Sequence, residues 1–427
     1  MHILLLTHYF PPEVNAPASR TFEHCSRWVQ AGHQVTVITC APNCPTGVVF
    51  DGYRNAWRSE EAVAGIRVIR VWSWLSANKG FLGRILNFVS YMLTAVWAAI
   101  RLRKVDVVVA TSPQFFCGWA GVLCHWIRRW PFVLEIRDIW PESIVTVGAM
   151  RRSWTIRVLE WLELRMYAAA QFIVTVGDGY RDQLLLRKVP LAKMAVIPNG
   201  VDLRRFQPRE RDPAVRREWG GTGKFVCAYV GTIGMAHGLE VVLEAADQLR
   251  KQGRDDVHFW IVGDGAERAS LEREAAGRGL TSIRFTGLVS KDRVEDVLAS
   301  CDACLVHLRG TELFGTVIPS KVFEIMAMNV PIIMGVRGQA QEIVLHGAAG
   351  IPMTPDDPQS LIDCVREIQK QRCRFTNGRE HVAQHFDRDH LAARMLHLLE
   401  RHVGPEVQAV PLPALQIAER DSGRKAA

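Results

Sequence analysis

The chain has 427 residues, enough for two or three domains with ample apolar core. Its composition, 48% hydrophobic and 22% charged, excludes an intrinsically disordered chain and fits a soluble globular protein. The formal net charge of +8 suits anionic small molecules, a membrane surface or nucleic acid, and does not choose among them.

Ten cysteines are scattered along the chain, and Cys301 and Cys304 form a CxxC pair inside an apolar run. Without a second such pair, we expect buried small side chains here rather than a zinc or redox site. The first 13 residues have too short an apolar run for a signal peptide and are expected to form a first strand. A long cysteine-bearing chain of this kind indicates a reducing cytoplasm.

Short apolar runs alternate with helical segments along the first half of the chain. A proline-rich loop, 8–19, follows the first run, and a helix is expected from about Arg20 to Gln30. The alternation predicts an α/β fold with a doubly wound parallel sheet, although the GxGxxG dinucleotide fingerprint is absent. Ligands of such sheets bind beyond the carboxyl ends of the strands. We expect these strands at 3–7, 34–40, 66–72, 105–110, 132–136, 172–176 and 194–197.

Residues 203–223 are charged and contain proline and glycine, which is typical of a linker between domains. The alternation then restarts, with strands expected at 224–231, 258–263, 283–286, 302–308 and 330–334. The chain is therefore divided into an N-terminal domain, a linker, a C-terminal domain, a closing helix and a loose tail. The predicted boundaries are 1–202, 203–223, 224–385, 386–403 and 404–427.

Residues 81–103 are more apolar than the rest of the first domain. About 16 mostly apolar residues separate Arg84 from Arg101, whereas a helix that spans a membrane needs about 20. Two alternatives remain, a buried helix or an interfacial helix on a membrane surface. Trp97, Tyr91 and the flanking basic residues favour the interfacial helix.

Residues 310–331 carry an unusual charge pattern. A loop with Gly310 and Gly315 leads to a short apolar helix expected from Lys321, with Ser320 as its N-cap. Lys321 opposes the helix dipole unless an anion binds there, and first-turn amides with a lysine suit a phosphate. Glu324 is a carboxylate within the apolar helix. The alternative is an exposed lysine and a solvated glutamate.

Several motifs together resemble one protein family. VIPNGVDLRRF at 196–206, FWIVGDGAER at 259–268 and IRFTGL at 283–288 resemble landmarks of glycosyltransferase family 4, which are retaining enzymes with the GT-B architecture. Residues 310–331 are similar to the Glu-x7-Glu region of that family, with Glu324 as the second glutamate. EIRDIWPES at 135–143 and HYFPPEVNAPASR at 8–20 resemble bacterial capsule, O-antigen and colanic-acid transferases, close to the N-acetylfucosamine transferase type.

The resemblance implies two facing Rossmann-like domains, a nucleotide sugar held mainly by the C-terminal domain, and no cofactor or metal. It places Glu324 on the ribose hydroxyls, while the diphosphate is expected to contact Ser320, Lys321 and Val322. The loop after the first strand of the second domain contains Gly231 and His237 but lacks the arginine and lysine that are usual there. Lys321 is therefore expected to neutralise more of the diphosphate charge. Turn and base-binding positions are implied for Gly263, Gly265, Gly287 and Val289.

On the N-terminal side, the resemblance implies that Asn15, Ala16 and Arg20 approach the diphosphate from the first loop. Catalytic positions are implied for Arg137, Asp138 and the nearby Glu142, together with Glu324; the alternative for Arg137 and Asp138 is an ion pair that caps a helix. The chain departs from the family pattern at the first glutamate, because the register places Thr316 there. Gly315 and Thr316 are then expected to meet the sugar through backbone groups.

The leading hypothesis is a membrane-associated glycosyltransferase in surface polysaccharide biosynthesis. It would move an N-acetylated hexosamine from a UDP donor to a polyprenyl-diphosphate-linked saccharide on the inner, cytoplasmic face of the membrane, without binding nucleic acid. Two alternatives stay open: a nucleotide-sugar epimerase or related GT-B enzyme, and a non-catalytic subunit that binds nucleotide sugar.

Overall fold

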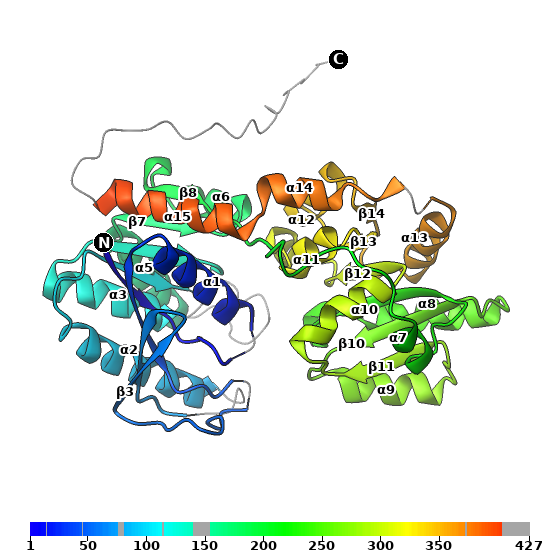
Figure 1. Cartoon of the computed structure of the whole chain (residues 1–427), viewed down its shortest axis with the longest axis horizontal. Helices are drawn as coiled ribbons and strands as arrows, with labels where there is room; N and C mark the ends of the chain where they lie inside the picture. Colours follow the sequence, from blue (N-terminus) through cyan, green and yellow to red (C-terminus); the bar gives the residue numbers. More distant parts are fainter. Residues whose placement is uncertain are drawn as a thin grey trace, which may run out of the picture.

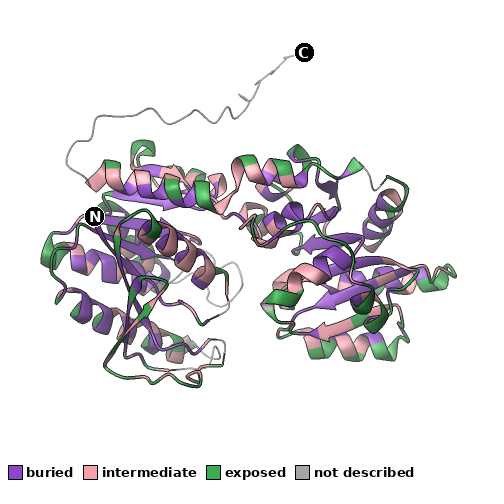
Figure 2. Ribbon diagram, viewed as in Figure 1, coloured by how far each residue is buried: buried purple, intermediate pink, exposed green. Residues whose placement is uncertain are grey.

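The computed structural model describes residues 1–13, 15–44, 46–75, 81–112, 115–139, 154–371 and 374–403. Two α/β domains face each other, and the chain crosses between them twice, near residue 202 and near residue 387 (Figure 1). Each domain is built on a sheet whose central strands are buried on both faces, as expected for parallel strands that are covered by helices (Figure 2).

The N-terminal sheet has the strand order β3-β4-β2-β1-β5-β6-β7-β8. β3 pairs antiparallel with β4, and the other neighbouring pairs among these strands are parallel. The carboxyl ends of the parallel strands therefore lie at one edge of the sheet. The strands are β1 (His2–Leu6), β2 (Gln34–Cys40), β3 (Arg58–Val63), β4 (Ile66–Val71), β5 (Val107–Thr111), β6 (Phe132–Ile136), β7 (Phe172–Thr175) and β8 (Met194–Val196).

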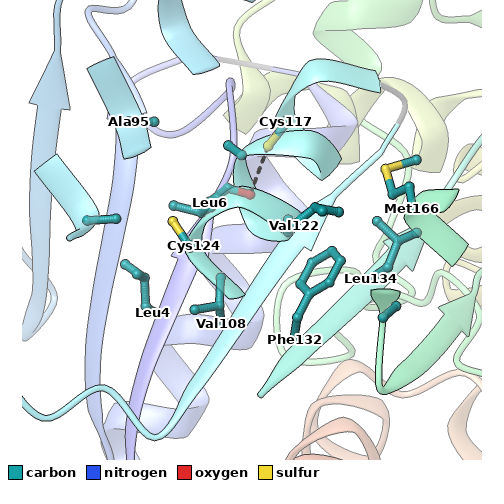
Figure 3. Close-up of a cluster of buried hydrophobic side chains, with 14 of the residues drawn as sticks. Leu4, Leu6, Ala95, Val108, Cys117, Val122, Cys124, Phe132, Leu134 and Met166 are labelled. Atoms are coloured by element: carbon teal, nitrogen blue, oxygen red, sulfur yellow. Dashed lines mark hydrogen bonds between the residues drawn. The ribbon is translucent and has the colours of Figure 1, made fainter. Parts of the chain in front are cut away.

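Helices cover both faces of this sheet. One core joins the sheet to α2 (Phe81–Ala99), α3 (Phe115–Arg128), α5 (Trp154–Ala169) and α6 (Asp178–Leu186). Figure 3 shows part of it, where the Cys117 thiol donates to the Leu6 carbonyl at 3.2 Å. The opposite core packs α1 (Ala16–Gln30) and the final helix α15 (Arg388–Val403) against the sheet.

The C-terminal sheet has the order β11-β10-β9-β12-β13-β14 and is parallel throughout the described pairs. Separate cores lie on its two faces. The strands are β9 (Phe225–Val230), β10 (Val257–Val262), β11 (Ile283–Gly287), β12 (Ala303–His307), β13 (Ile332–Gly335) and β14 (Gly350–Pro352), and the helices are α8 (Glu240–Lys251), α9 (Arg268–Gly277), α10 (Val294–Ser300), α11 (Lys321–Ala327), α12 (Gln339–His346), α13 (Pro358–Gln371) and α14 (Gly378–His385).

The two crossing segments pack closely. Residues 203–223, predicted as a linker, contain the short helix α7 (Pro213–Glu218), and Phe206, Val215 and Trp219 join the C-terminal core. The last helix, α15, returns to the N-terminal domain, where the Trp28 indole donates to the Ala392 carbonyl at 3.1 Å. The tail predicted at 404–427 lies outside the described residues.

The doubly wound α/β class is confirmed, with three local differences. β3 and β14 were not predicted, since β3 is polar and half-exposed and β14 has three residues. The predicted start of the first helix at Arg20 is wrong, because α1 begins at Ala16 with Asn15 as N-cap. The Asn15 side chain accepts from the Ala18 amide at 2.8 Å. The proline in the first turn has no amide hydrogen, so it leaves no hydrogen-bond donor without a partner there.

The apolar segment near residue 90 forms α2, which has one face in the core and one face exposed; contact of the exposed face with a membrane stays a prediction. Tyr91 and Ala95 are fully buried in the core, whereas Leu86, Leu93 and Trp97 are exposed. Within the described part of the chain, no helix has both the length and the apolar character that a membrane span requires.

Candidate functional site

A cavity of about 390 Å³ lies between the two domains, beside the crossing segments. Its walls come from the N-terminal half of α1, the segment after β8, the loop after β9, the start of α11 and the start of α15. Seven predicted positions share this cavity with residues that were not predicted: Asn15, Ala16, Arg20, Gly231, Ser320, Lys321 and Glu324. The lining residues are Asn15, Ala16, Ser19, Arg20, Glu23, His24, Asn199, Gly200, Arg205, Phe206, Gly231, Thr232, Val294, Ser320, Lys321, Glu324, Arg388 and Leu391.

Lys321 supplies an unpaired cation to the cavity wall. Its Nζ atom is buried, has no hydrogen-bond partner among the described residues and lies 3.7 Å from the centre of the Tyr229 ring. Burial lowers the pKa of Lys321 to about 7, although Cys304 and Glu324 act in the opposite direction. A buried cation without a partner is costly, so an anion in the cavity would be stabilised at this point.

Glu324 lies on α11, less than one turn beyond Lys321, and also lines the cavity. The start of this helix differs from the prediction, because Ser320 is already in the helical region and its side chain makes no capping hydrogen bond. The Val322 amide donates to the Pro319 carbonyl at 3.0 Å, which occupies one amide that was expected to face phosphate. The charged side chains therefore matter more here than the first-turn amides.

The glycines of the second domain bring three loops together. A Cβ atom at Gly263 would lie 1.9 Å from the Gly231 carbonyl oxygen, and one at Gly265 would lie 2.1 Å from the Ile233 carbonyl oxygen. Both Gly231 and Gly263 have positive φ angles, which strain other residues. The Gly263 amide also donates to the Gly287 carbonyl at 3.0 Å. These glycines set the shape of the loop that carries Gly231 to the cavity.

His237 holds the far end of that loop. Burial lowers its pKa to about 4, with a further contribution from the Lys321 charge, so the imidazole is neutral. Its carbonyl accepts from Nδ1 of the buried His307 at 2.7 Å, and the Asp356 amide donates to Nε2 of His307 at 3.0 Å. These bonds give His237 a structural role in the present conformation, and it does not line the cavity.

The predicted N-terminal positions divide into two groups. Asn15 and Ala16 open α1 at the cavity, but Arg20 lies within the helix and not in a loop. Its guanidinium donates to Glu135 at 2.9 Å and to the carbonyls of Ile197 and Pro198 at 2.9 and 2.7 Å. Arg20 thus ties α1 to the segment that leads into the second domain.

Arg137 and Asp138 follow β6 and do not line this cavity. Burial lowers the pKa of Arg137 to about 10, and its guanidinium donates to the Pro17 carbonyl at 3.4 Å. Asp138 lies close enough to Tyr180 to raise the pKa of that phenol, after burial as the larger cause. Glu142 lies outside the described residues.

Thr316 forms part of a direct contact between the two domains. A Cβ atom at Gly179 would lie 3.3 Å from the Thr316 Cβ atom, so the start of α6 and the loop before α11 meet closely. Beside this contact, the Asp178 amide donates to Gln339 Oε1 at 3.0 Å, and Gln339 Nε2 donates to the Asp178 carboxylate at 2.6 Å. Gly315 lies next to this contact, because a Cβ at Gly338 would approach its carbonyl oxygen to 2.2 Å.

The remaining predicted positions do not line the cavity. Val322 is fully buried in the C-terminal core, and Val289 packs against that core after β11. Sequence reasoning missed the contributions of Glu23, His24, Arg205 and Arg388. Arg388 could not have been found, because nothing in its local sequence indicates that α15 returns to the N-terminal domain. Among the described residues, no group of three or more His, Cys, Asp or Glu side chains could hold a metal ion.

Comparisons with known proteins agree with this two-domain arrangement. Residues 15–200 match the family model described as glycosyl transferase 4-like domain, and residues 224–371 match the model described as glycosyl transferases group 1. The two matches coincide with the two sheets on either side of the cavity.

Relatives and a solved structure match along nearly the whole chain. WcaI of Escherichia coli K12, assigned as a colanic acid biosynthesis glycosyl transferase, is 26% identical over 410 residues, covering 93% of this chain and 99% of its own. A GDP-mannose-dependent alpha-(1-6)-phosphatidylinositol monomannoside mannosyltransferase of Mycobacterium tuberculosis is 27% identical over 412 residues, covering 93% and 97%. The structure of Anabaena Alr3699/HepE in complex with UDP-glucose superimposes with a TM-score of 0.67 at 17% identity, covering 94% and 99%. The chain is a glycosyltransferase of the GT-B fold and belongs to family 4, with a glycosyl transferase 4-like domain followed by a group 1 domain.

Proposed function

We propose that the protein transfers an N-acetylated hexosamine from a UDP donor to a polyprenyl-diphosphate-linked saccharide, with retention of configuration, in bacterial surface polysaccharide biosynthesis. The observation that carries the proposal is the buried and unpartnered ammonium of Lys321 at the wall of the interdomain cavity. A diphosphate would supply the anion that this group lacks in the described residues.

The donor is proposed to lie across α11 and the loop after β9. Lys321 then pairs with the diphosphate, and Glu324 accepts hydrogen bonds from the ribose hydroxyls. Because Gly231 has no side chain, phosphate oxygens can approach the backbone of its loop. The UDP-glucose in the Anabaena structure supports a UDP donor, and the name of the Escherichia coli relative supports a polysaccharide product.

Transfer with retention places the acceptor hydroxyl on the face that the diphosphate leaves. The bond from the anomeric carbon to the phosphate oxygen breaks, the acceptor oxygen bonds to that carbon, and the acceptor proton passes to the departing phosphate. No base from the protein and no metal is needed in this scheme. Lys321 would stabilise the departing charge in a site that water reaches poorly, the kind of electrostatic effect that dominates many enzymes. Arg137 and Asp138 are proposed to orient the sugar or acceptor after domain closure.

The acceptor is proposed to reach the enzyme from the inner face of the cell membrane. The outer face of α2 exposes Leu86, Leu93 and Trp97, and the Arg101 guanidinium lies 3.5 Å from the centre of the Trp97 ring. α5, which packs against α3 on the same side of the sheet, exposes Trp161, with Arg165 at 5.1 Å from its ring centre. Tryptophan and arginine side by side suit the boundary between anionic lipid headgroups and acyl chains.

A donor screen tests the proposed reaction. The full-length protein is incubated with UDP- and GDP-linked sugars, including UDP-N-acetylglucosamine, and a synthetic polyprenyl-diphosphate-linked saccharide, with and without a chelator. We expect an acceptor-dependent product from a UDP-N-acetylhexosamine, with the donor's anomeric configuration in the NMR spectrum. A product from GDP-sugars alone, or with inverted configuration, would contradict the corresponding part of the proposal.

A further inference from the structure

His24 is a buried polar residue that faces the interdomain cavity from α1, on the N-terminal side. The residue is 5% exposed and is among those that line the cavity. Its ring makes an edge-to-face contact with Trp28, with ring centres 5.7 Å apart. Among the described residues, no hydrogen bond to either ring nitrogen is found, and neither nitrogen is one of the fully buried polar atoms without a partner, so water in the cavity can reach them.

In contrast to His24, the arginines around it have hydrogen-bond partners in the protein. Arg20 is occupied by Glu135 and by two backbone carbonyls, as described above. Arg388 donates to the Gly200 carbonyl at 2.8 Å and to Glu23. An imidazole that lines the cavity without a protein partner can bind water in the free enzyme and a polar group of a bound molecule in its place.

The surroundings of His24 determine which chemistry it can recognise. Burial and the nearby charges of Arg20, Arg137, Arg27 and Arg388 hold its pKa well below the usual range, so the ring is neutral. A neutral imidazole presents one N–H donor and one nitrogen acceptor. A hydroxyl group can use either nitrogen, since it both donates and accepts, whereas a phosphate oxygen can only accept.

We propose that His24 hydrogen-bonds a hydroxyl of the nucleotide sugar and so selects and orients the donor. This rests on the proposed function, because Lys321 and Glu324 must hold the same molecule from the opposite wall. The hydroxyl belongs either to the ribose or to the transferred sugar. A substitution at His24 should weaken binding of both UDP and UDP-N-acetylglucosamine in the first case, and of UDP-N-acetylglucosamine alone in the second.

Two substitutions at this position separate ligand binding from structure. His24→Phe removes both hydrogen-bonding groups but keeps a flat ring against Trp28, and His24→Gln retains a donor and an acceptor. Dissociation constants for UDP and UDP-N-acetylglucosamine are measured by calorimetry for both variants and the wild type, together with their thermal unfolding midpoints. Binding of UDP by the wild type is the separate check on the proposed function.

We expect His24→Phe to weaken binding about threefold to tenfold, the usual effect of one neutral hydrogen bond, with an unchanged or higher unfolding midpoint. His24→Gln should recover at least part of the affinity. Equal losses for both ligands assign the hydroxyl to the ribose, and a loss confined to UDP-N-acetylglucosamine assigns it to the sugar. Wild-type affinity of His24→Phe for both ligands, or loss of affinity only in proportion to lost stability, would overturn the inference.

Discussion

The ammonium of Lys321 lies over the ring of Tyr229, 3.7 Å from its centre, in the wall of the interdomain cavity. Cys304 and Glu324 favour the charged form of the lysine, but burial is the larger effect and lowers its pKa to about 7. The nearby His237 is neutral and adds no charge. The free enzyme therefore holds a lysine that titrates near neutral pH, and a diphosphate would restore its charge.

Affinity for UDP should fall as pH rises above 7. Because the free lysine has a pKa of about 7 and an anion would raise that pKa, binding should take up a proton between the two values. We expect the dissociation constant of the wild type to rise from pH 7 to pH 9, whereas Lys321→Met should bind weakly with little pH dependence. Calorimetry in two buffers of different ionisation enthalpy measures the proton uptake. Parallel pH profiles of the two proteins would contradict the assignment.

The same substitution should stabilise the protein without ligand. The folded state holds Lys321 with a pKa well below its unfolded value of 10.5, so the folded chain binds fewer protons between about pH 7 and that value. This lysine's destabilising contribution is absent above the unfolded pKa and grows as pH falls through that window. Lys321→Met should therefore raise the unfolding midpoint at pH 7 more than at pH 9, measured by calorimetry. An unchanged or lower midpoint at pH 7 would show that Nζ has a partner after all.

Glu324 should act on ribose rather than on phosphate. A hydrogen bond to a charged group contributes about 1.5–3 kcal/mol, so Glu324→Ala should weaken UDP binding about tenfold to a hundredfold and abolish transfer. For the wild type, 2′-deoxy-UDP should bind more weakly than UDP, and this difference should disappear in Glu324→Ala. Lys321→Met provides the matched control, because it should retain the difference between the two nucleotides.

The two-domain architecture could be predicted from the sequence, whereas the full set of residues that line the cavity could not. Buried parallel strands such as β1 and β9 are continuous apolar runs, which local reasoning detects well. The half-exposed β3 lacks that pattern, and it forms because β4 offers an edge for antiparallel pairing. A local pattern also marks the start of α1, because Asn15 is a residue type that favours the N-cap position, although the helix was predicted to start later.

Residues from distant parts of the chain form the cavity, and their partners decide their roles. Arg20 and Lys321 are both cations in predicted positions, yet Arg20 is fully engaged by Glu135 and backbone carbonyls, while Lys321 is unpaired among the described residues. No property of the local sequence distinguishes the two. Arg388 joins them because α15 crosses back to the first domain, which depends on tertiary packing of its apolar face.

The contact between Asp178 and Gln339 should help to set how the two domains are arranged during transfer. Gln339→Ala removes both hydrogen bonds, whereas Asp178→Ala removes only the bond to its carboxylate, because the backbone amide remains. Gln339→Ala should lower kcat/KM about threefold to tenfold and Asp178→Ala somewhat less, and the double variant should lose little more than Gln339→Ala alone. Arg181→Ala is the control, since Arg181 pairs with Asp178 at 2.7 Å within the same helix and does not cross to the second domain. Additive losses in the double variant would mean that the two residues act separately.

The exposed face of α2 should hold the protein on anionic membranes. Leu86, Leu93 and Trp97 are 51%, 58% and 43% exposed, so changing all three to glutamine should release the protein from phosphatidylglycerol vesicles without lowering its unfolding midpoint. Leu345→Gln on α12, 42% exposed in the other domain, is the matched control and should remain bound. Flotation at low and high salt measures the effect, and the aromatic and basic contacts predict weaker binding in high salt. Wild-type flotation of the triple variant would move the membrane contact to another surface, and a large fall in its unfolding midpoint would mean that these side chains serve the core.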